Sequence, residues 1–495
     1  MKKSIFGILL QLESLFLVLT SAVCLLYDEA GWQVFATLAA LCFAGGAMSI
    51  SVRKWQMRRN CMAVSTYLPR ADSFMIVALT WVLFSLIGMV PFVRLAGMDA
   101  TDSFFETMSA FTTTGATVVP DIDGLSHGLK FWRSIMQWMG GLGIVVFTFA
   151  LVPAGEMRNN NVFSAEATGI SLDKFSPKIG STARKLLLIY LALTGACALC
   201  YRLGPMTTFD AVCHAFTTVA TGGFSTHSAS IAYFRSPYIE YVCSIFMLLS
   251  SLNFGMYYYA FIRRWDIIRN NEELNAFFKI VFVAVMGFML LFNYAHHCQE
   301  NLASLPSGLE EQFRTALFHV STTISSSGFA ATKFDYVAWG DAYLLPTIIL
   351  MAIGTCAGST GGGIKVVRFI VVWKAIRNEF LQQLHPRAVL SVNTGGKVVG
   401  NDRVKRTLCF VIIYMGLVIA GITVMSFFGI DSVTSLGSTV TALSNIGPGA
   451  GITGPASNFA SLHPIVKWLL SFYMLVGRLE IYTVLFLFMP DFYKK

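Results

Sequence analysis

Long apolar segments recur along the whole chain, separated by shorter polar stretches. Two of them follow each other near the amino terminus, "IFGILLQLESLFLVLTSAVCLL" (residues 5–26) and "VFATLAALCFAGGAMSISV" (residues 34–52). A helix needs about 20 predominantly apolar residues to cross the hydrocarbon core of a bilayer, and by that criterion about ten segments are long enough. The pattern therefore predicts an all-α polytopic membrane protein.

The apolar segments after the first two form four pairs, and each pair encloses a weaker segment rich in glycine and hydroxyl residues. The pairs are residues 74–96 with 129–153, 186–203 with 238–262, 277–295 with 343–373, and 407–429 with 465–489. We therefore expect two N-terminal transmembrane helices and a basic loop in residues 1–70, followed by four units in residues 71–155, 156–265, 266–400 and 401–495.

The four enclosed segments align without gaps on one shared glycine. They read "SAFTTTGATV" from Ser109, "TTVATGGFST" from Thr217, "TTISSSGFAA" from Thr322 and "TALSNIGPGA" from Thr441. The shared glycines are Gly115, Gly223, Gly328 and Gly447. Six residues before each glycine stands a hydroxyl residue, and four residues before it an apolar one. Four such matches indicate an internal repeat.

Each enclosed segment has the composition of a short helix followed by an extended strand. Asp102, Asp210 and Asp431 stand where an acidic residue suits a helix start. In the third segment, "SGLEEQFRT", the position of the helix start is less clearly marked. The glycine is expected to end the helix, because its backbone adopts conformations that other residues avoid. Each segment is therefore predicted to enter the membrane partway as a helix and to leave as a strand.

Non-helical backbone at membrane depth is tolerated only where it is buried in protein or lines a water-filled cavity. Four pseudo-symmetric helix–pore loop–helix repeats around one axis would form a central pore. The carboxyl ends of the short helices favour a cation there, and strand carbonyls can replace its water shell. The filter is predicted to consist of the backbone carbonyls of Thr113, Thr114, Gly115, Thr221, Gly222, Gly223, Ser326, Ser327, Gly328, Asn445, Ile446 and Gly447. No carboxylate stands among them, which favours a monovalent ion.

The composition agrees with a membrane protein: 55% of the residues are hydrophobic, and the mean hydropathy is +0.63. Of the 36 Lys and Arg residues, 26 fall in segments that share one side of the membrane if ten spans alternate. By the positive-inside rule that side is the cytoplasm, and it holds both termini. The formal net charge of +9 therefore needs no nucleic-acid partner.

Several motifs together resemble the Trk/Ktr/HKT superfamily of potassium transporters, most closely its bacterial TrkH/TrkG branch. They are "TTTGATV", "TVATGGFSTH", "CAGSTGGGIKVVRF", "HPRA" and "VGRLEIYT". The resemblance implies a homodimer in the bacterial cytoplasmic membrane, with one K⁺ pathway per chain, no organic cofactor and no enzymatic activity. It also implies that glycine at position 115 favours potassium, whereas serine there would raise sodium transport. The third and fourth repeats, which read "SSSGF" and "SNIGPG", depart from the other two. We therefore expect only approximate four-fold symmetry and a looser selectivity for K⁺ over Na⁺ than in a symmetric channel.

The stretch "GTCAGSTGGGIK", residues 354–365, interrupts the second apolar segment of the third repeat. Its five glycines cannot sustain a regular helix, and its lysine lacks the spacing of a phosphate-binding loop. The resemblance implies an intramembrane gate, and a passive helix kink is the alternative. The expected gating residues are Gly354, Gly358, Ser359, Thr360, Gly361, Gly362, Gly363, Lys365 and Arg478. Arg478 lies in an apolar segment, where a charge is usually functional, although pairing with Glu480 or with backbone carbonyls is the simpler explanation.

The polar stretches 154–185 and 374–406 are longer than simple turns require. They are either plain connectors or, as the resemblance implies, contacts for a cytoplasmic TrkA-type ring of nucleotide-binding domains that opens the gate. The chain itself has no GxGxxG motif after a strand. A proton- or sodium-coupled symporter, a less selective K⁺/Na⁺ pathway and a membrane receptor without transport remain as alternative functions.

Overall fold

The computed structural model describes residues 2–60, 70–143, 179–298, 305–331 and 335–490. Within these ranges, six helices are long and apolar enough to cross a membrane, or eight spans if each of two bent helix pairs counts as one. Of the ten predicted spans, one ends in residues 144–153, outside the described part, and another is broken after twelve residues. The chain is a multi-pass, all-α membrane protein.

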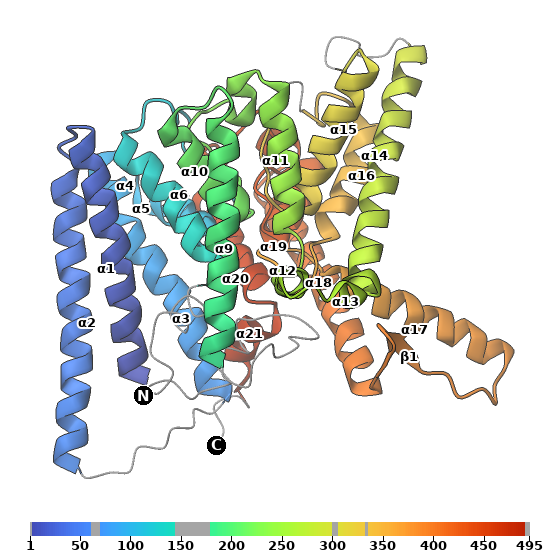
Figure 1. Cartoon of the computed structure of the whole chain (residues 1–495), viewed down its shortest axis with the longest axis horizontal. Helices are drawn as coiled ribbons and strands as arrows, with labels where there is room; N and C mark the ends of the chain where they lie inside the picture. Colours follow the sequence, from blue (N-terminus) through green and yellow to red (C-terminus); the bar gives the residue numbers. More distant parts are fainter. Residues whose placement is uncertain (1, 61–69, 144–178, 299–304, 332–334, 491–495) are drawn as a thin grey trace.

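The first two helices, α1 (Lys2–Leu26) and α2 (Trp32–Asn60), form an antiparallel hairpin at one edge of the molecule (Figure 1). They cross closely at two glycines: a Cβ atom added to Gly46 would lie 2.6 Å from the carbonyl oxygen of Gly7, and one added to Gly7 would lie 2.8 Å from that of Gly46. Small residues at a crossing allow membrane helices to approach at backbone distance.

Each of the four repeats contains a first membrane helix, a short pore helix and a second membrane helix. The first helices are α3 (Arg70–Gly88), α9 (Ile179–Arg202), α14 (Glu272–Cys298) and α18 (Asn401–Phe427). The pore helices are α5 (Ala100–Phe111), α10 (Thr208–Val219), α15 (Leu309–Ile324) and α19 (Ser432–Ser444). The second helices are α6 (His127–Leu142), α11 (Pro237–Ser250), α16 (Asp341–Ala352) and α20 (Pro464–Arg478).

The repeats close into a ring because each second helix packs on the pore helix of the following repeat. The contacts are α6 with α10, α11 with α15, α16 with α19, and α20 back to α5. Two of these interfaces contain ion pairs: Lys467 lies 2.5 Å from Asp102, and Arg314 contacts Glu240. The four pore helices therefore surround one axis, as the repeat predicts.

Side chains at the amino ends of the pore helices satisfy backbone N–H groups that have no partner within the helix. Asp431 caps α19 as predicted, accepting from Thr434 N–H at 2.9 Å. In α5 and α10 the caps are instead Asp99 and Thr207, and the predicted acidic residues stand in the first turn. The third start, at Gly308, has no side-chain cap.

Two of the second helices bend sharply at their ends and a third, α16, stops after twelve residues, although only this third interruption is predicted. α11 bends by 91° into α12 (Phe254–Phe261), and α20 bends by 114° into α21 (Tyr482–Leu485) and the 3-10 turn η3 (Phe486–Phe488). Predicting residues 238–262 and 465–489 as continuous spans was therefore wrong. Apolar composition continues through both bends, so hydropathy does not reveal them.

The remaining elements lie at the two ends of the ring. They are α4 (Val90–Leu95), η1 (Ser230–Phe234), α13 (Trp265–Arg269), α17 (Val366–Leu384), β1 (Val392–Thr394), β2 (Lys397–Val399) and η2 (Gly451–Thr453). α17 projects sideways from the bundle and carries the β1–β2 hairpin, a small departure from an all-α chain (Figure 1). Val371 of α17 packs on Val392 and Val399 of the hairpin.

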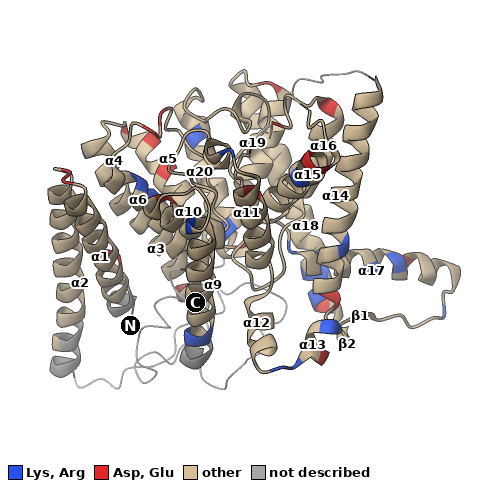
Figure 2. Ribbon diagram, turned by 45° about the horizontal axis from the view of Figure 1, so that its top comes forward, with Lys and Arg blue, Asp and Glu red and all other residues tan. Residues whose placement is uncertain are grey.

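Many charged residues lie toward the two ends of the molecule, and a smaller number lie within the bundle (Figure 2). Figure 2 shows Lys and Arg side chains around α13, α17 and the lower part of α9. The loop that joins α1 to α2 carries acidic residues at the opposite end. The apolar bodies of the spanning helices lie between these two charged zones, as expected for a protein that crosses a bilayer.

The glycine crossing predicts opposite effects at two neighbouring positions. Gly46→Ala is expected to lower thermal stability in detergent, because the new methyl group would overlap the Gly7 carbonyl, and such overpacking costs about 1–3 kcal/mol. Gly45→Ala is the control, since its methyl group would meet only Leu10 at 4.0 Å and alanine favours a helix. Equal melting temperatures for the two variants would contradict the close crossing.

Candidate functional site

The four pore helices are closely followed by a residue whose backbone is left-handed, two positions before each shared glycine. Their φ values are 54° at Thr113, 55° at Thr221, 57° at Ser326 and 54° at Asn445. Positive φ is uncommon outside glycine, and its occurrence at four equivalent positions is a strained conformation of the kind that clusters at functional sites. The helices themselves end at Phe111, Val219, Ile324 and Ser444, so the prediction that the glycine ends the helix was wrong by three or four residues.

The same four-fold pattern appears in the hydrogen bonds that finish the helices. The N–H of the residue before each shared glycine donates to the carbonyl of the hydroxyl residue aligned five positions earlier. The donor–acceptor pairs are Thr114 to Ser109 (2.9 Å), Gly222 to Thr217 (2.8 Å), Ser327 to Thr322 (3.0 Å) and Ile446 to Thr441 (3.1 Å). Bonds of this kind commonly close helices whose last residue is left-handed. The aligned hydroxyl residues thus share a backbone role.

The shared glycines form a closed ring with carbonyl oxygens of the neighbouring repeats. Their φ values are also positive, from 75° at Gly223 to 110° at Gly447. A side chain at each glycine would collide with the carbonyl of the residue that precedes the next glycine around the axis. The pairs are Gly115 with Gly222, Gly223 with Ser327, Gly328 with Ile446, and Gly447 with Thr114. The four predicted filter strands are therefore brought together, each against the next.

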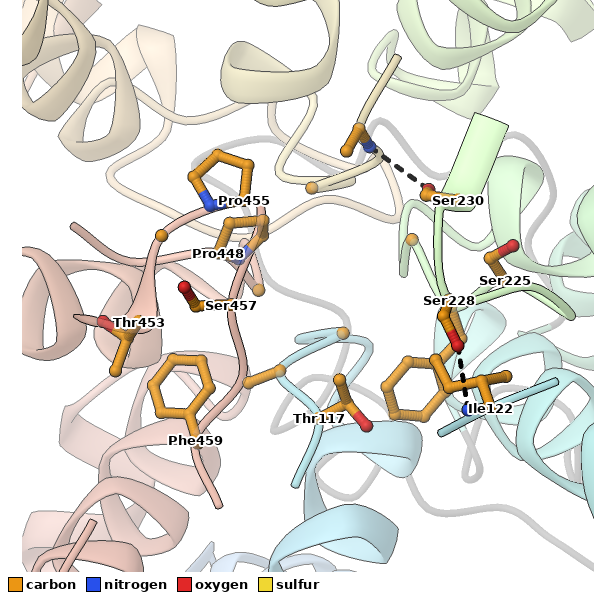
Figure 3. A pocket seen from close by; sticks show the side chains of 18 of the residues that line it. Thr117, Ile122, Ser225, Ser228, Ser230, Pro448, Thr453, Pro455, Ser457 and Phe459 are labelled. Carbon is orange, nitrogen blue, oxygen red and sulfur yellow. Dashed lines mark hydrogen bonds between the residues drawn. The ribbon is translucent and has the colours of Figure 1, made fainter. Parts of the chain in front are cut away.

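A cavity of about 80 Å³, here called the mouth cavity, opens on one side of this ring and touches all four shared glycines. Figure 3 shows the side chains around it, including Thr117, Ser225, Pro448 and Phe459. The strands that leave the ring are tied to one another, since Ile122 N–H donates to Ser228 Oγ at 3.0 Å. The ring thus has an open approach from this side.

Two acidic side chains hold His227 at the wall of the mouth cavity. His227 Nδ1 lies 2.7 Å from Oδ1 of Asp123, and Nε2 lies 3.5 Å from Oδ1 of Asp210. Burial disfavours the charged imidazole, but hydrogen bonds and attraction from both carboxylates outweigh it and raise the pKa of His227 above its usual value. These three side chains fasten the strand after Gly223 to the first repeat.

A buried ion pair stands behind the first two strands and was missed in the sequence. Arg133 Nε lies 2.8 Å from Glu106 Oε1, and the other Glu106 oxygen accepts from Val118 N–H at 3.0 Å. Arg133 also donates to the Ser225 carbonyl at 3.1 Å and lies over the Phe224 ring. The available signal was a charge within the apolar segment 129–153, which usually marks function in a membrane helix.

The interruption predicted at residues 354–365 is a loop closed on itself. Gly354 N–H donates to the Ile364 carbonyl at 2.8 Å, and Ile364 N–H donates to the Ala352 carbonyl at 3.1 Å. Lys365 Nζ donates to Thr355 Oγ1 at 3.0 Å and to the Gly361 carbonyl. α17 begins directly after the loop. The loop therefore joins the third pore repeat to the projecting arm, which consists of α17 and the β1–β2 hairpin.

The loop lies against the carboxyl ends of the pore helices, on the far side of the ring from the mouth cavity. Thr360 Oγ1 donates to the Val219 carbonyl at the end of α10 (3.1 Å), and Gly362 N–H donates to Ser326 Oγ (2.7 Å). A side chain at Gly362 would collide with the Ser444 carbonyl at the end of α19. The predicted gating loop and the predicted filter are therefore in direct contact.

The broken end of α11 supplies further contacts to the loop. Thr360 Oγ1 donates to the Ser250 carbonyl at 3.3 Å, and Cys356 N–H donates to the Ser251 carbonyl at 3.1 Å. On the opposite side, Phe254 N–H donates to the Gly358 carbonyl at 3.1 Å. The break at residues 251–253 thus frees backbone groups that the loop satisfies.

Arg478 is the last residue of α20, at its bend rather than inside a continuous helix. Nη1 donates to the Thr360 carbonyl at 2.6 Å, and Nη2 donates to the carbonyls of Gly141 (3.0 Å) and Gly140 in α6. Glu480 pairs instead with Arg368 of α17. The guanidinium therefore joins the loop to the carboxyl end of α6 through backbone carbonyls, which is one of the two simpler pairings expected for this arginine.

Glu273 of α14 also holds the loop, and the sequence did not single it out. Its Oε1 accepts from Ala357 N–H at 2.7 Å and from Val367 N–H, in the first turn of α17, at 3.3 Å. The adjacent Glu272 pairs with Lys374 and accepts from Gly395 N–H of the β-hairpin at 3.0 Å. One helix end thus links the loop to the projecting arm.

Backbone oxygens are the ligands that this site offers. Among the described residues, no group of three or more His, Cys, Asp or Glu side chains is arranged to hold a metal ion. The carbonyls of the ring and the carboxyl ends of four pore helices favour a cation on the axis. All of the residues predicted for the filter and for the gating loop lie in the ring or in the loop that packs against it.

Comparison with known proteins gives one consistent family. The model of the TrkH family, described as cation transport protein, matches residues 39–494. The potassium uptake proteins TrkH and TrkG of Escherichia coli K12 are 34% and 35% identical to the chain; each match spans 99% of it and 98% or 97% of the relative. The crystal structure of the potassium transporter TrkH from Vibrio parahaemolyticus superposes with a TM-score of 0.83, at 32% identity, over 99% of this chain and 98% of that one.

Proposed function

Because this chain belongs to the TrkH family of cation transport proteins, we propose that it is the potassium-translocating subunit of a bacterial Trk system. It carries K⁺ across the cytoplasmic membrane, with both termini in the cytoplasm. The observation that carries the proposal is the closed ring in which each shared glycine lies against a carbonyl of the next repeat. Such a ring supplies oxygen ligands from four strands to one ion.

The proposed path begins in the mouth cavity. K⁺ loses water as it enters the ring, where the carbonyls of residues 113–115, 221–223, 326–328 and 445–447 replace its hydration shell. The negative ends of the four pore helix dipoles stabilise the ion just beyond. Beyond the ring, residues 354–365 block the axis, and transport requires that this loop move.

Arg478 is proposed to hold the gate closed. Its three hydrogen bonds join Thr360 of the loop to two carbonyls of α6, and a planar guanidinium suits such a multiple contact better than an ammonium group. Thr221 and Ser326 contribute from the filter side, through Thr360 Oγ1 and Gly362 N–H. Opening the gate breaks these bonds.

A cytoplasmic TrkA-type nucleotide-binding ring is the proposed regulator. Curated relatives carry the name Trk system potassium uptake protein, which indicates a system of several components. The expected contacts are residues 154–185, of which residues 154–178 lie outside the described part, and residues 374–406 in the projecting arm. The arm reaches the loop through α17, Glu272 and Glu273.

A second copy of the chain is proposed to pack on α17. α17 projects from the bundle (Figure 1) and carries Trp373, Phe380 and Leu384. Phe380 follows Trp373 by seven residues and Leu384 follows Phe380 by four, so all three lie on one face of the helix. Their exposed fractions are 71%, 64% and 72%. An exposed apolar face of this kind usually marks an interface, and a homodimer would cover it while membrane lipid surrounds the spanning helices.

Reversal potentials of the purified protein in a planar bilayer test the proposed function against proton- or sodium-coupled symport. Under opposed K⁺ and H⁺ gradients, the reversal potential is expected to follow the K⁺ gradient alone, because no protonated side chain is needed in a carbonyl filter. A potential that shifts with the proton gradient would favour the proton-coupled symporter. The same measurement under opposed K⁺ and Na⁺ gradients tests sodium dependence, which a sodium-coupled symporter and a less selective pathway would share.

Substitution at the ring tests the filter. Gly115→Ser and Gly115→Ala are both expected to lower the K⁺ over Na⁺ permeability ratio roughly tenfold, equivalent to about 1.4 kcal/mol, because either Cβ displaces the Gly222 carbonyl. Gly97→Ser is the control, since its φ of 64° is equally unusual but no atom lies within 4 Å of its Cβ position. An unaltered ratio in both Gly115 variants would remove that glycine from the filter.

If the hydrogen bonds of Arg478 act as a latch that holds the loop closed, removing them should let K⁺ pass without a regulatory partner. Arg478→Ala and Arg478→Lys are both expected to raise K⁺ flux several-fold in proteoliposomes without a regulatory partner, because neither side chain can bridge the three carbonyls. Arg202→Ala, which removes a charge from the end of α9, is the control. Unchanged flux in the Arg478 variants would contradict a latch.

A further inference from the structure

Gln137 of α6 is fully buried and bonds the second filter strand on both sides of its shared glycine. Nε2 donates to the Gly222 carbonyl at 2.7 Å, and Oε1 accepts from Phe224 N–H at 3.1 Å. The backbone groups fix the orientation of the amide, because the Phe224 N–H requires an acceptor and the Gly222 carbonyl requires a donor. A single side chain thus spans the strand around Gly223.

This contact distinguishes the second strand from the other three. The positions equivalent to Gly222 are Thr114, Ser327 and Ile446, and in the part of the chain that the structure describes, none of their carbonyls accepts from a side chain. Gly222 itself must lack a side chain, because a Cβ atom there would collide with the Gln137 amide. The double glycine of "TGGF" is therefore explained by the bulk of Gln137.

The oxygen that Gln137 holds belongs to the filter ring. The Gly222 carbonyl is the group against which Gly115 packs, at the seam between the first and second strands. A carbonyl oxygen has two lone pairs, so one can bond Gln137 while the other faces the axis. The hydrogen bond from Gln137 resists movement of this oxygen toward the axis. Na⁺ is smaller than K⁺, so the ring oxygens would have to move closer to the axis to coordinate it.

The helix that carries Gln137 is anchored at its start and one turn before Gln137. At its start, Glu29 of the α1–α2 loop accepts from the N–H groups of His127 (2.6 Å) and Gly128 (2.9 Å). One turn before Gln137, Arg133 bonds the Ser225 carbonyl and pairs with Glu106 of α5. These bonds prevent α6 from following a displaced strand.

We propose that Gln137 is a specificity-determining residue of the ion pathway: its amide fixes the Gly222 carbonyl at the distance that suits K⁺ and so disfavours Na⁺. The inference rests on the filter proposed above. Gln137 acts through Gly222 and Phe224 and does not itself touch the ion. Its effect therefore appears in the permeability ratio, which a merely structural role would leave unchanged.

Two variants test this role in the full-length protein in bilayers. Gln137→Met keeps the volume but loses both hydrogen bonds, and Gln137→Asn keeps the amide on a shorter side chain that does not reach the strand. Both are expected to lower the K⁺ over Na⁺ permeability ratio from bi-ionic reversal potentials, by roughly tenfold if about 1.4 kcal/mol of discrimination is lost. Melting temperature and size-exclusion elution establish that each variant is folded.

Ser134→Ala is the matched control, because Ser134 is also buried on α6 and its hydroxyl donates to the Lys130 carbonyl rather than to the filter. A wild-type ratio in either folded Gln137 variant overturns the inference, as does a loss of flux at constant ratio. If Gly115→Ser lowers the ratio while the Gln137 variants do not, only this inference fails. If none of them lowers it, the filter assignment fails as well.

Discussion

A backbone carbonyl at membrane depth has no water to bond, and this constraint organises the whole protein. The pore helices stop inside the membrane, so their last carbonyls need other partners. Some face the axis, where a cation can satisfy them. The loop at residues 354–365 meets another, because Thr360 bonds the Val219 carbonyl at the end of α10; the same hydroxyl bonds the Ser250 carbonyl at the broken end of α11. The proposed filter and the loop therefore both supply partners to carbonyls that have no hydrogen-bond donor within their own helix.

The local part of this architecture could be predicted from the sequence. Composition and spacing identified the membrane class, the two N-terminal helices, the four repeats and the glycines of the ring, because each depends on a short run of residues. The interruption at residues 354–365 was equally visible, since five glycines stand within it. The exact helix end was not, because Thr113 and Thr221 adopt a left-handed backbone conformation that β-branched residues rarely adopt.

The remaining features depend on residues far apart in the chain. The bends after Ser250 and Arg478 are invisible to hydropathy because the segments stay apolar on both sides. Glu273 reaches the loop from another helix, and its sequence neighbours give no sign of that contact. Arg133 and Gln137 did carry a signal, being polar residues four apart on one face of an apolar helix. Only the folded ring reveals which strand they support.

Because all four repeats lie in one polypeptide, the ring need not be built from equal parts. In an assembly of four identical subunits, a side chain placed behind the filter would appear four times, and any substitution would change every strand together. Here Gln137 stands behind one strand only, with Gly222 as its partner. A single mutation there therefore alters one quarter of the ring and leaves the other three strands with their own contacts.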